Sequence, residues 1–404
     1  MRILKINAQE EAKRIMQEIG VDPCGLKIML PKVISYAVLL KDVSSISANI
    51  LKQEMLSIGG DVAVARGVLN GEFKRSSCLV FGNLAQLERL AGKLKLQPFG
   101  LKVQAQALLE SLDSYQKDKF ILKLGNFKLA LGCKTRIMAI MNLTPDSFSG
   151  DGLYDLLARK DLSAILAIAE KLVSDGADIL DIGGESTRPN AAFVTAKEEI
   201  SRIKPVIKLL AKKIKVPISV DTYKPVVAQA ALDAGALLVN DISGLRSAGM
   251  RRVVAAAKAT VVIMHMRGAS PATMQKNVRY CCFLDEVISE LSVAVKCAEE
   301  DGIKPEKIII DPGIGFGKLP EHNLEMLNHL DELKILGKPM MVGISRKAFI
   351  RKIVGDDPAA LVLGSLSGCV LSALKGAQIV RVHDVKAVSD GLKISDAIRK
   401  NYYA

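Results

Sequence analysis

The stretch from Ile308 to Lys318 reads IIIDPGIGFGK, a short apolar strand that ends in an aspartate, a proline and three glycines. A unit of this kind occurs eight times between Arg136 and Asp384. The other seven ends read MNLTPDSF from Met141, DIGGESTRP from Asp181, SVDT from Ser219, VNDIS from Val239, IMHMRG from Ile263, VGISRK from Val342 and RVHD from Arg381. Segments with helical periodicity, such as Leu162–Val173 and Glu198–Lys213, separate them. Parallel strands buried on both faces read as continuous apolar runs, so this alternation predicts an α/β fold, a (β/α)₈ TIM barrel.

The polar residues at these strand ends predict the position of the functional site. In a (β/α)₈ barrel the carboxyl ends of all eight strands meet at one mouth, where the active site is built. Here those ends supply asparagine, aspartate, arginine, lysine and histidine side chains. We therefore expect one active site that draws on most of the strands.

The length of the chain requires a second domain. The sequence has 404 residues, whereas a (β/α)₈ barrel takes about 250. We expect a smaller mixed α/β N-terminal domain at 1–117 and the barrel at 118–404. The N-terminal pattern predicts helices at Ala8–Glu18, Ser44–Leu56, Leu84–Leu96 and near Val103–Leu112, strands at Val33–Leu40, Asp61–Ala65 and Ser77–Phe81, and a polar linker at Ser111–Lys119. This domain has no catalytic spacing, which favours a packing or oligomerisation role over ligand binding.

A hairpin is expected between the two domains. Phe127–Ala130 and Thr135–Ala139 are strand-like and flank Gly132. Their spacing predicts a hairpin that leads into the first barrel strand. We expect this hairpin to cover the bottom of the barrel.

Composition excludes several classes of partner. The net charge of +13 is spread over both parts of the chain, and aromatic residues are only 4%, which disfavours nucleic-acid binding. No apolar run approaches the roughly 18 residues of a membrane span. The first twenty residues carry charges throughout, so they do not resemble a secretory signal, and the cytoplasm is the default compartment. The seven cysteines show no metal-binding spacing, which favours free thiols.

The strand-end motifs together resemble the dihydropteroate synthase family. Seven of them, NLTPDSFS, DIGGESTRP, SVDT, VNDI, DPGIGFGK, SRK and RVHD, stand in that family's order. The resemblance covers the barrel and leaves the N-terminal domain outside. It implies a transferase of folate biosynthesis that joins 6-hydroxymethyl-7,8-dihydropterin pyrophosphate to p-aminobenzoate and releases 7,8-dihydropteroate and pyrophosphate. It also implies a homodimer.

The resemblance implies a pterin subsite built from carboxylates. Asp221 and Asp311 match pterin-binding aspartates, Asn240 supplies an amide, and Lys347 donates to the acceptor edge of the ring. Carboxylates suit the donor edge of a pterin, which presents a ring N–H beside an exocyclic amine. Asp181 is a further candidate contact. Met264 either forms a wall of this subsite or packs in the core, and the sequence leaves both readings open.

A second group of residues is implied for the departing pyrophosphate. Asn142 resembles the single protein ligand of Mg²⁺, an ion that prefers oxygen ligands and keeps several waters. Arg188, Arg381 and His383 are candidate phosphate contacts through charge-assisted hydrogen bonds. His383 stands two residues from Arg381 on a strand, so both point to the same face.

The resemblance places p-aminobenzoate beside the pterin. Thr187, Pro189, Phe316 and Ser345 correspond to its contacts, and Asp146 to a stabiliser of the cation that forms when pyrophosphate leaves. An aromatic amine is uncharged at neutral pH, so no strong general base is needed. No Ser–His or Cys–His pair suited to covalent catalysis stands out in the sequence.

Two rival functions stay open at this point. A pterin-dependent methyltransferase on the same barrel would share the pterin aspartates and Asn240 but has no use for a phosphate clamp. A non-catalytic pterin sensor would tolerate loss of Asn142, Arg188 or His383, all of which are present. The motifs STRP, SRK and RVHD favour the synthase.

Overall fold

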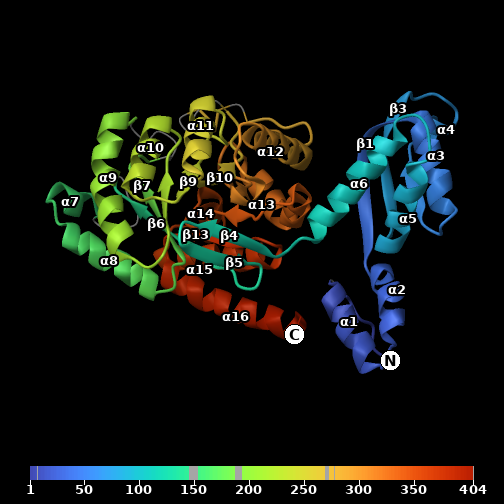
Figure 1. Cartoon of the computed structure of the whole chain (residues 1–404), viewed down its shortest axis with the longest axis horizontal. Helices are drawn as coiled ribbons and strands as arrows, with labels where there is room; N and C mark the ends of the chain where they lie inside the picture. Colours follow the sequence, from blue (N-terminus) through green and yellow to red (C-terminus); the bar gives the residue numbers. More distant parts are fainter. Residues whose placement is uncertain (7, 145–152, 187–192, 269–272, 277, 404) are drawn as a thin grey trace. The chain divides into compact units, whose positions relative to one another are not determined.

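Two compact units make up the chain. The computed structural model describes residues 1–6, 8–144, 153–186, 193–268, 273–276 and 278–403. One unit comprises Met1–Asp113 with Arg399–Ala404, and the other Ser114–Ile398. The fold class predicted from the sequence is confirmed, because the second unit is a barrel of parallel strands and the first is a smaller α/β unit (Figure 1).

The first unit packs helices against one face of a three-stranded antiparallel sheet. The strands, β1 (Ser35–Ser44), β2 (Asp61–Val64) and β3 (Arg75–Asn83), lie in the order β1-β3-β2. The helices are α1 (Gln9–Glu18), α2 (Pro23–Val33), α3 (Ser45–Leu56), α4 (Arg66–Leu69), α5 (Leu84–Leu94) and α6 (Leu101–Gln116). The core includes Leu51, Val80, Leu87 and Leu90. Asn83 starts α5 with a capping box in which its side chain accepts from Gln86 N, an arrangement that fixes a helix start.

Two features of this region differ from the sequence expectations. Helix α2 was missed, although Asp22 caps its N-terminus by accepting a hydrogen bond from Cys24 N at 2.8 Å. The boundary between the two units falls inside the expected linker Ser111–Lys119, but this segment is helical as far as Gln116, because α6 continues through it. Leu101, Ala105, Leu108 and Leu112 recur at helical spacing and are buried, so the polar residues of this segment belong to the exposed face of a helix.

The barrel of the second unit contains eight parallel strands. They are β6 (Arg136–Asn142), β7 (Ile179–Gly183), β8 (Ile218–Asp221), β9 (Leu238–Asp241), β10 (Thr260–Met264), β11 (Ile308–Asp311), β12 (Met341–Val342) and β13 (Ile379–Val382). Their order is β11-β10-β9-β8-β7-β6-β13-β12, and a bridge between Ile310 and Met340 closes the ring. Every residue of β7 to β11 is buried, as the continuous apolar runs predicted.

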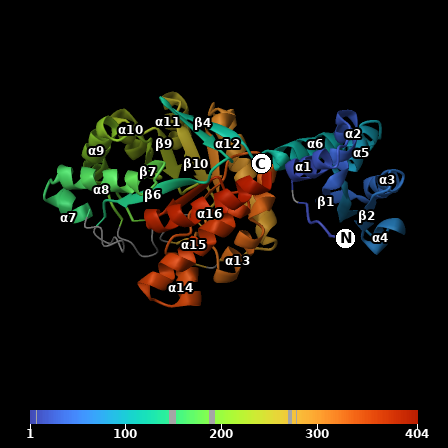
Figure 2. The ribbon, with the colours of Figure 1, turned by 90° about the horizontal axis from the view of Figure 1, so that it is seen from below.

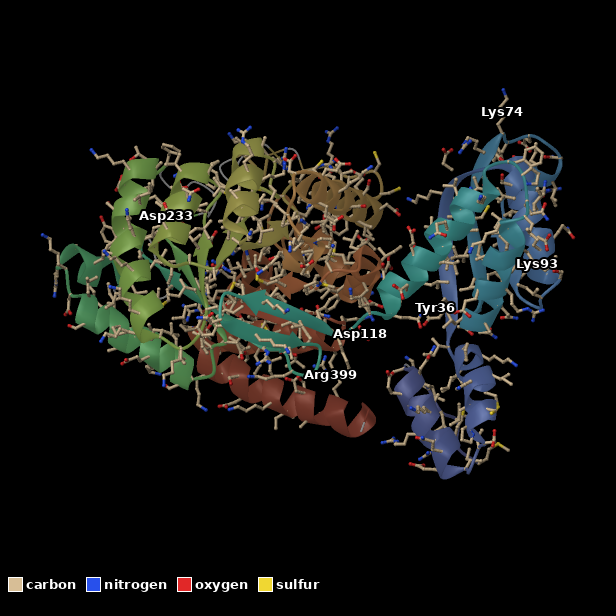
Figure 3. All side chains as sticks on the ribbon, in the orientation of Figure 1. Tyr36, Lys74, Lys93, Asp118, Asp233 and Arg399 are labelled. Atoms are coloured by element: carbon tan, nitrogen blue, oxygen red, sulfur yellow. The ribbon has the colours of Figure 1, made fainter. Side chains whose placement is uncertain are left out.

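Helices surround the strands of the barrel (Figures 1 and 2). They are α7 (Leu153–Ala158), α8 (Leu162–Ser174), α9 (Ala196–Lys213), α10 (Pro225–Ala234), α11 (Ala248–Ala257), α12 (Phe283–Glu300), α13 (Pro320–Asn328), α14 (Ala348–Val354), α15 (Pro358–Leu374) and α16 (Val385–Tyr403), with 3₁₀ turns at Pro305–Lys307 and Leu330–Leu336. Polar side chains such as Asp233 of α10 cover the outer faces (Figure 3). Within the described residues no single helix is long and apolar enough to cross a bilayer, and the pair α14–α15, which passes that test jointly, is bent by 116°.

A hairpin closes the bottom of the barrel, but its strands differ from those expected. β4 (Phe120–Leu124) pairs with β5 (Phe127–Leu131), whereas residues 135–139 belong mostly to the first barrel strand. Leu122, Leu124 and Leu131 of the hairpin pack against residues from the starts of the barrel strands, namely Met138, Ile179, Leu238, Val262, Ile309, Met341 and Ile379. Gly132 has a positive φ of 94°, and a Cβ there would lie 2.1 Å from the carbonyl oxygen of Asp118. The chain needs this glycine to pass from the hairpin into the barrel.

Candidate active site

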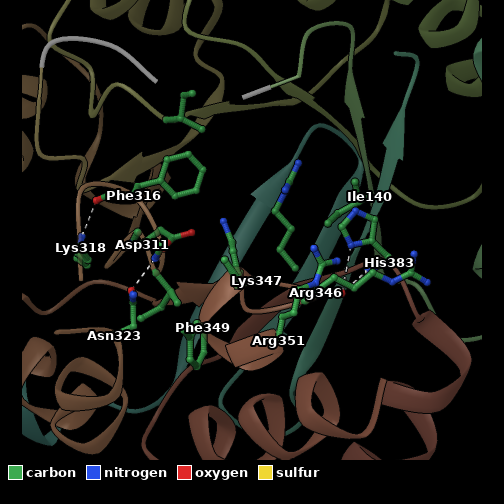
Figure 4. Close-up of a pocket in the computed structure, with 18 of the residues that line it drawn as sticks. Ile140, Asp311, Phe316, Lys318, Asn323, Arg346, Lys347, Phe349, Arg351 and His383 are labelled. Atoms are coloured by element: carbon green, nitrogen blue, oxygen red, sulfur yellow. Dashed lines mark hydrogen bonds between the residues drawn. The ribbon is translucent and has the colours of Figure 1, made fainter. Parts of the chain in front are cut away.

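A cavity of about 1010 Å³ opens at the carboxyl ends of the strands (Figure 4). This volume lies at the upper end of the range for small-molecule sites. The structure brings ten of the sequence-predicted residues to its walls: Asn142, Asp221, Asn240, Met264, Asp311, Phe316, Ser345, Lys347, Arg381 and His383. Asp181 does not line the cavity. Asp146, Thr187, Arg188 and Pro189 lie outside the described residues.

Arg381 is the centre of a network of buried polar groups. Its Nε donates to Asp181 Oδ2 and its Nη2 donates to Asp221 Oδ2, both at 2.6 Å. Asn240 Nδ2 donates to the same Asp181 oxygen at 3.0 Å. Asp181 has no exposed surface, so its carboxylate orients Arg381 and Asn240 from behind the cavity wall. Although burial alone would lower it, the pKa of Arg381 is raised by these two carboxylates.

Several acceptor atoms in this network have no donor. Asp181 Oδ1, Asp221 Oδ1 and Asn240 Oδ1 are buried and receive no hydrogen bond from the described residues. Leaving a buried acceptor unpaired costs about 1–3 kcal/mol. Asp221 and Asn240 line the cavity, so a ligand with adjacent N–H donors can satisfy their two oxygens.

Two of the carboxyl groups that line the cavity, Asp221 and Asp311, have shifted acidities. Burial raises the pKa of Asp221 to about 7, although the Arg381 charge opposes that rise. Burial also raises the pKa of Asp311 to about 6, against the Gly313 N–H and the charges of Lys347, Lys318 and Arg381. Asp311 Oδ1 accepts the Gly313 N–H at 2.7 Å, which fixes the carboxyl group at the start of the turn that follows β11. Both groups therefore titrate near the pH at which an enzyme of neutral conditions works.

A cation and an aromatic ring are in contact on the cavity wall. Lys347 Nζ lies 4.0 Å from the centre of the Phe316 ring, within the range of a cation–π interaction. Phe316 belongs to a cluster with Ile242, Met264, Met266 and Met274. The sequence left open whether Met264 packs in the core or forms a wall of the pterin subsite. The structure shows that it packs in this cluster and also lines the cavity.

Ser345 and His383 come together from neighbouring strand ends. Ser345 Oγ lies 3.2 Å from His383 Nδ1 and accepts the His383 backbone N–H at 3.2 Å. Both residues line the same cavity as Arg381, in agreement with the strand spacing of Arg381 and His383. Arg346, between Ser345 and Lys347, forms an ion pair of 2.6 Å with Asp384.

Asn142 stands at the end of β6 beside a glycine of β7. A Cβ at Gly183 would lie 2.9 Å from Asn142 Oδ1, so the glycine leaves room for the amide. An amide oxygen is a ligand that Mg²⁺ accepts when substrate phosphate and water fill its other positions. The residues therefore fit a magnesium ion. Within the described residues no cluster of three or more His, Cys, Asp or Glu side chains forms a metal site.

Sequence reasoning missed other residues of the cavity wall. Arg346 and Lys318 stand inside the motifs VGISRK and IIIDPGIGFGK, so the signal was present but no role was assigned to them. Asn323 of α13 had no sequence signal. Its Oδ1 accepts the Gly315 N–H at 2.7 Å, which holds the turn after β11. Glu185 also lines the wall and lies 3.0 Å from Lys224 Nζ.

Comparisons with known proteins agree with this geometry. The model of the family described as "Pterin binding enzyme" matches residues 138–383. The dihydropteroate synthase of Synechocystis is 43% identical over 279 residues, which are 69% of this chain and 94% of that protein. Two haloarchaeal proteins named probable bifunctional folylpolyglutamate synthase/dihydropteroate synthase also match. That of Haloferax volcanii is 38% identical over 84% of this chain, and that of Halobacterium salinarum is 36% identical over 98% of it.

The relatives differ in whether their match to this chain includes the first unit. This chain spans 40% of the Haloferax protein and 46% of the Halobacterium protein. The Halobacterium match includes nearly all of the first unit, whereas the Synechocystis match has the length of the barrel alone.

Solved structures give the same result for the barrel. Yersinia pestis dihydropteroate synthase in complex with a sulfonamide drug is 37% identical with a TM-score of 0.65, covering 70% of this chain and 100% of that one. The Thermus thermophilus enzyme in complex with 4-aminobenzoate is 39% identical with a TM-score of 0.61, covering 69% and 99%.

Proposed function

The chain belongs to the pterin-binding enzyme family, and from this premise we propose how its cavity carries out the reaction. Its activity is that of a dihydropteroate synthase, a transferase of folate biosynthesis. It condenses 6-hydroxymethyl-7,8-dihydropterin pyrophosphate with p-aminobenzoate to give 7,8-dihydropteroate and pyrophosphate. The single observation that carries the proposal is the pair of unpaired buried acceptors, Asp221 Oδ1 and Asn240 Oδ1, in a cavity that also holds Asp311.

The pterin is bound by the carboxylate side of the cavity. Asp311, Asp221 and Asn240 accept the ring N–H and exocyclic amine hydrogens, while Lys347 donates to the acceptor edge. Buried acceptors without partners support this assignment, since a pterin that supplies the donors removes their desolvation cost. Asp181 acts indirectly, because its hydrogen bonds hold Arg381 and Asn240 in place.

Pyrophosphate departs on the cationic side. Arg381 and His383 neutralise its charge, and the Nε and Nη2 atoms of Arg381 are already turned to Asp181 and Asp221. The three remaining N–H groups of its guanidinium are thus the ones left for a phosphate oxygen. Asn142 holds Mg²⁺, which when bound supplies further charge to the leaving group. Arg188 is assigned to the same task by family resemblance.

The chemical step exchanges one bond for another at the pterin methylene. The C–O bond breaks, its electron pair leaves with pyrophosphate, and the lone pair of the aromatic amine forms the new C–N bond before the amine loses a proton. Phe316, Ser345, Thr187 and Pro189 hold p-aminobenzoate for this attack, and Asp146 stabilises the cation.

We also propose the setting in which the enzyme works. By family resemblance it is a homodimer of the cytoplasm, and residues 118–404 form the catalytic domain. Sedimentation equilibrium tests the first point, because a dimer sediments at twice the chain mass of 43.5 kDa. A chain that sediments as a monomer at micromolar concentration would contradict the proposed homodimer.

A turnover assay with both substrates tests the function. Purified enzyme with Mg²⁺ should release pyrophosphate and form dihydropteroate only when the pterin pyrophosphate and p-aminobenzoate are both present. Asp221→Ala should lose this activity. Pterin binding without pyrophosphate release would point to a sensor, and methyl transfer from a methylated folate would point to the methyltransferase.

A further inference from the structure

Lys318 is a buried lysine that the proposed reaction does not use. It is 3% exposed and lines the cavity beside the turn that follows β11 (Figure 4). Lysine is almost never fully buried unless it is paired. Among the described residues no carboxylate oxygen lies within ion-pair distance of its Nζ. A charge held this way at a cavity wall calls for an explanation in terms of the site.

The histidine next to Lys318 determines how its amine is held. Lys318 Nζ lies 2.8 Å from His265 Nδ1, and on the other side of the ring His265 Nε2 lies 3.2 Å from Glu290 Oε2. Burial lowers the pKa of His265 to about 4, so the ring is neutral and carries one proton. That proton belongs on Nε2, which faces the Glu290 carboxylate at ion-pair distance without hydrogen-bond geometry, and Nδ1 accepts a hydrogen from Lys318. The contact with His265 Nδ1 therefore orients the amine.

Lys318 also joins two segments of backbone. Its Nζ donates to the carbonyl oxygen of Phe316 at 3.3 Å and approaches that of His265 at 3.5 Å. The same segments touch at two glycines of positive φ. A Cβ at Gly313 would lie 1.9 Å from the His265 carbonyl oxygen, and one at Gly317 would lie 2.5 Å from that of Arg267. The turn of residues 311–318 thus packs directly against residues 265–267. Lys318, at the C-terminal end of the turn, links the two segments through its contacts with His265 and Phe316.

From these contacts we propose that Lys318 is a positioning residue of the pterin subsite: it fixes the turn that carries Asp311 and Phe316, and its positive charge acts on Asp311 from the other end of that turn. The inference rests on the proposed function, since it takes Asp311 to be a pterin contact. It assigns to Lys318, the last residue of IIIDPGIGFGK, a task distinct from that of Lys347, which contacts the Phe316 ring.

The charges around Lys318 determine the pH range of this effect. Burial lowers the pKa of Lys318 to about 7, while Asp311 and Glu290 oppose that fall and Lys347 and Arg267 add to it. The Asp311 carboxyl titrates at about pH 6, and the Lys318 charge lowers its pKa. Lys318 is thus mostly cationic up to about pH 6, over the acidic half of the range in which Asp311 ionises. Removing that charge raises the pKa of Asp311. As the pH is lowered, the Asp311 carboxylate is then protonated earlier, so pterin binding should be lost at a higher pH than in the wild type.

The test measures 6-hydroxymethyl-7,8-dihydropterin binding by calorimetry from pH 5 to pH 8 with the full chain. If the Asp311 pKa rises by one unit, Lys318→Met should weaken binding about fivefold at pH 6 and approach tenfold at pH 5, and move the acidic limb upward. Lys318→Gln keeps a polar contact but no charge, so it should move the limb in the same direction. Lys318→Arg should leave the limb in place. Lys296→Met, an exposed lysine on the same helix as Glu290, is the matched control and should change nothing.

The outcomes separate the two proposals. An acidic limb that is unchanged in both Lys318→Met and Lys318→Gln overturns this inference, while the function stands. If wild type binds no pterin, the proposed function fails instead. Circular dichroism melting of each variant identifies loss of fold, and if Lys318→Met does not fold, Lys318→Gln against Lys318→Arg decides.

Discussion

The two ends of the barrel are built on opposite principles. At the bottom, Leu122, Leu124 and Leu131 of the hairpin pack against apolar residues from seven barrel strands, and every one of these side chains is buried carbon or sulfur. At the mouth, Asp181, Asp221 and Asn240 each keep a buried acceptor atom without a donor among the described residues. The bottom lowers the free energy of the empty protein, whereas the mouth raises it. Because the apolar floor and the polar mouth belong to the same barrel, the stability of the floor can offset the cost of the unpaired polar groups at the mouth.

The largest expected effect is at the mouth and concerns turnover alone. Asn142→Ala should lower turnover by about two orders of magnitude or more, the scale of losing stabilisation of charge in the transition state, with no change in melting temperature. EDTA should abolish turnover of the wild type. Asn328→Ala, an exposed asparagine of α13, serves as the control. Full activity in EDTA would remove Asn142 from the proposed metal site.

The next effect is at the bottom and concerns stability alone. Leu124 is fully buried in the floor cluster, so Leu124→Ala should lower the free energy of unfolding by about 2–5 kcal/mol. The folded fraction should keep its kcat/KM. Ile121→Ala changes a residue of the same strand that is 52% exposed and should cost little in urea denaturation. A loss of kcat/KM in folded Leu124→Ala enzyme would contradict the separation of the two ends.

A third change should stabilise the fold while it impairs the site. The Asp311 carboxyl has a pKa of about 6 in the folded protein against 3.8 as its ordinary value, so between these values the folded state keeps a proton that the unfolded state has lost. Stability therefore falls as the pH rises through that window. Asp311→Asn removes this cost, which is at most about 3 kcal/mol at pH 7.

Thermal melts at two pH values check this expectation. Asp311→Asn should melt higher than wild type at pH 7, and the difference should vanish below pH 4, where both forms are neutral. The same variant should bind pterin more weakly, by about 1–3 kcal/mol for donors left without a carboxylate. A variant that melts lower than wild type at pH 7 would show that the carboxylate stabilises the empty site.

The smallest effect is expected where the first unit is removed. A chain that begins at Ser114 should bind pterin within about twofold of the full chain, since every described residue of the proposed site lies in the second unit. A chain that begins at Asp118 additionally loses the Tyr115 contacts with Asp331 and Lys334, so it should melt slightly lower. Loss of pterin binding in a folded Ser114 chain would mean that residues 1–113 contribute to the site.

The sequence predicted what depends on chemistry at strand ends and missed what depends on tertiary partners. Asp221, Asp311 and His383 could be placed because each ends an apolar run, and parallel strands bring such ends together. The hairpin partner was wrong because β4 and the first barrel strand are equally apolar, and only the tertiary fold distinguishes them. Lys318 stood inside a recognised motif, but its role could not be assigned because its histidine partner stands 53 residues away. Helix α2 has a proline within it, which masked its periodicity.

The way the ring closes has a consequence for synthesis of the chain. β6 to β11 follow one another in sequence, but β6 also pairs with β13, and β11 meets the β12 region through the single Ile310–Met340 bridge. A ribosome-bound chain that ends before Met340 can form an open sheet but no closed barrel. Leu122 and Leu124 then lack two of their floor partners, Met341 and Ile379, until the C-terminal strands emerge. The hairpin is made before the barrel strands, yet its cover is complete only when the last strands emerge, so part of its apolar face stays exposed on the nascent chain until then.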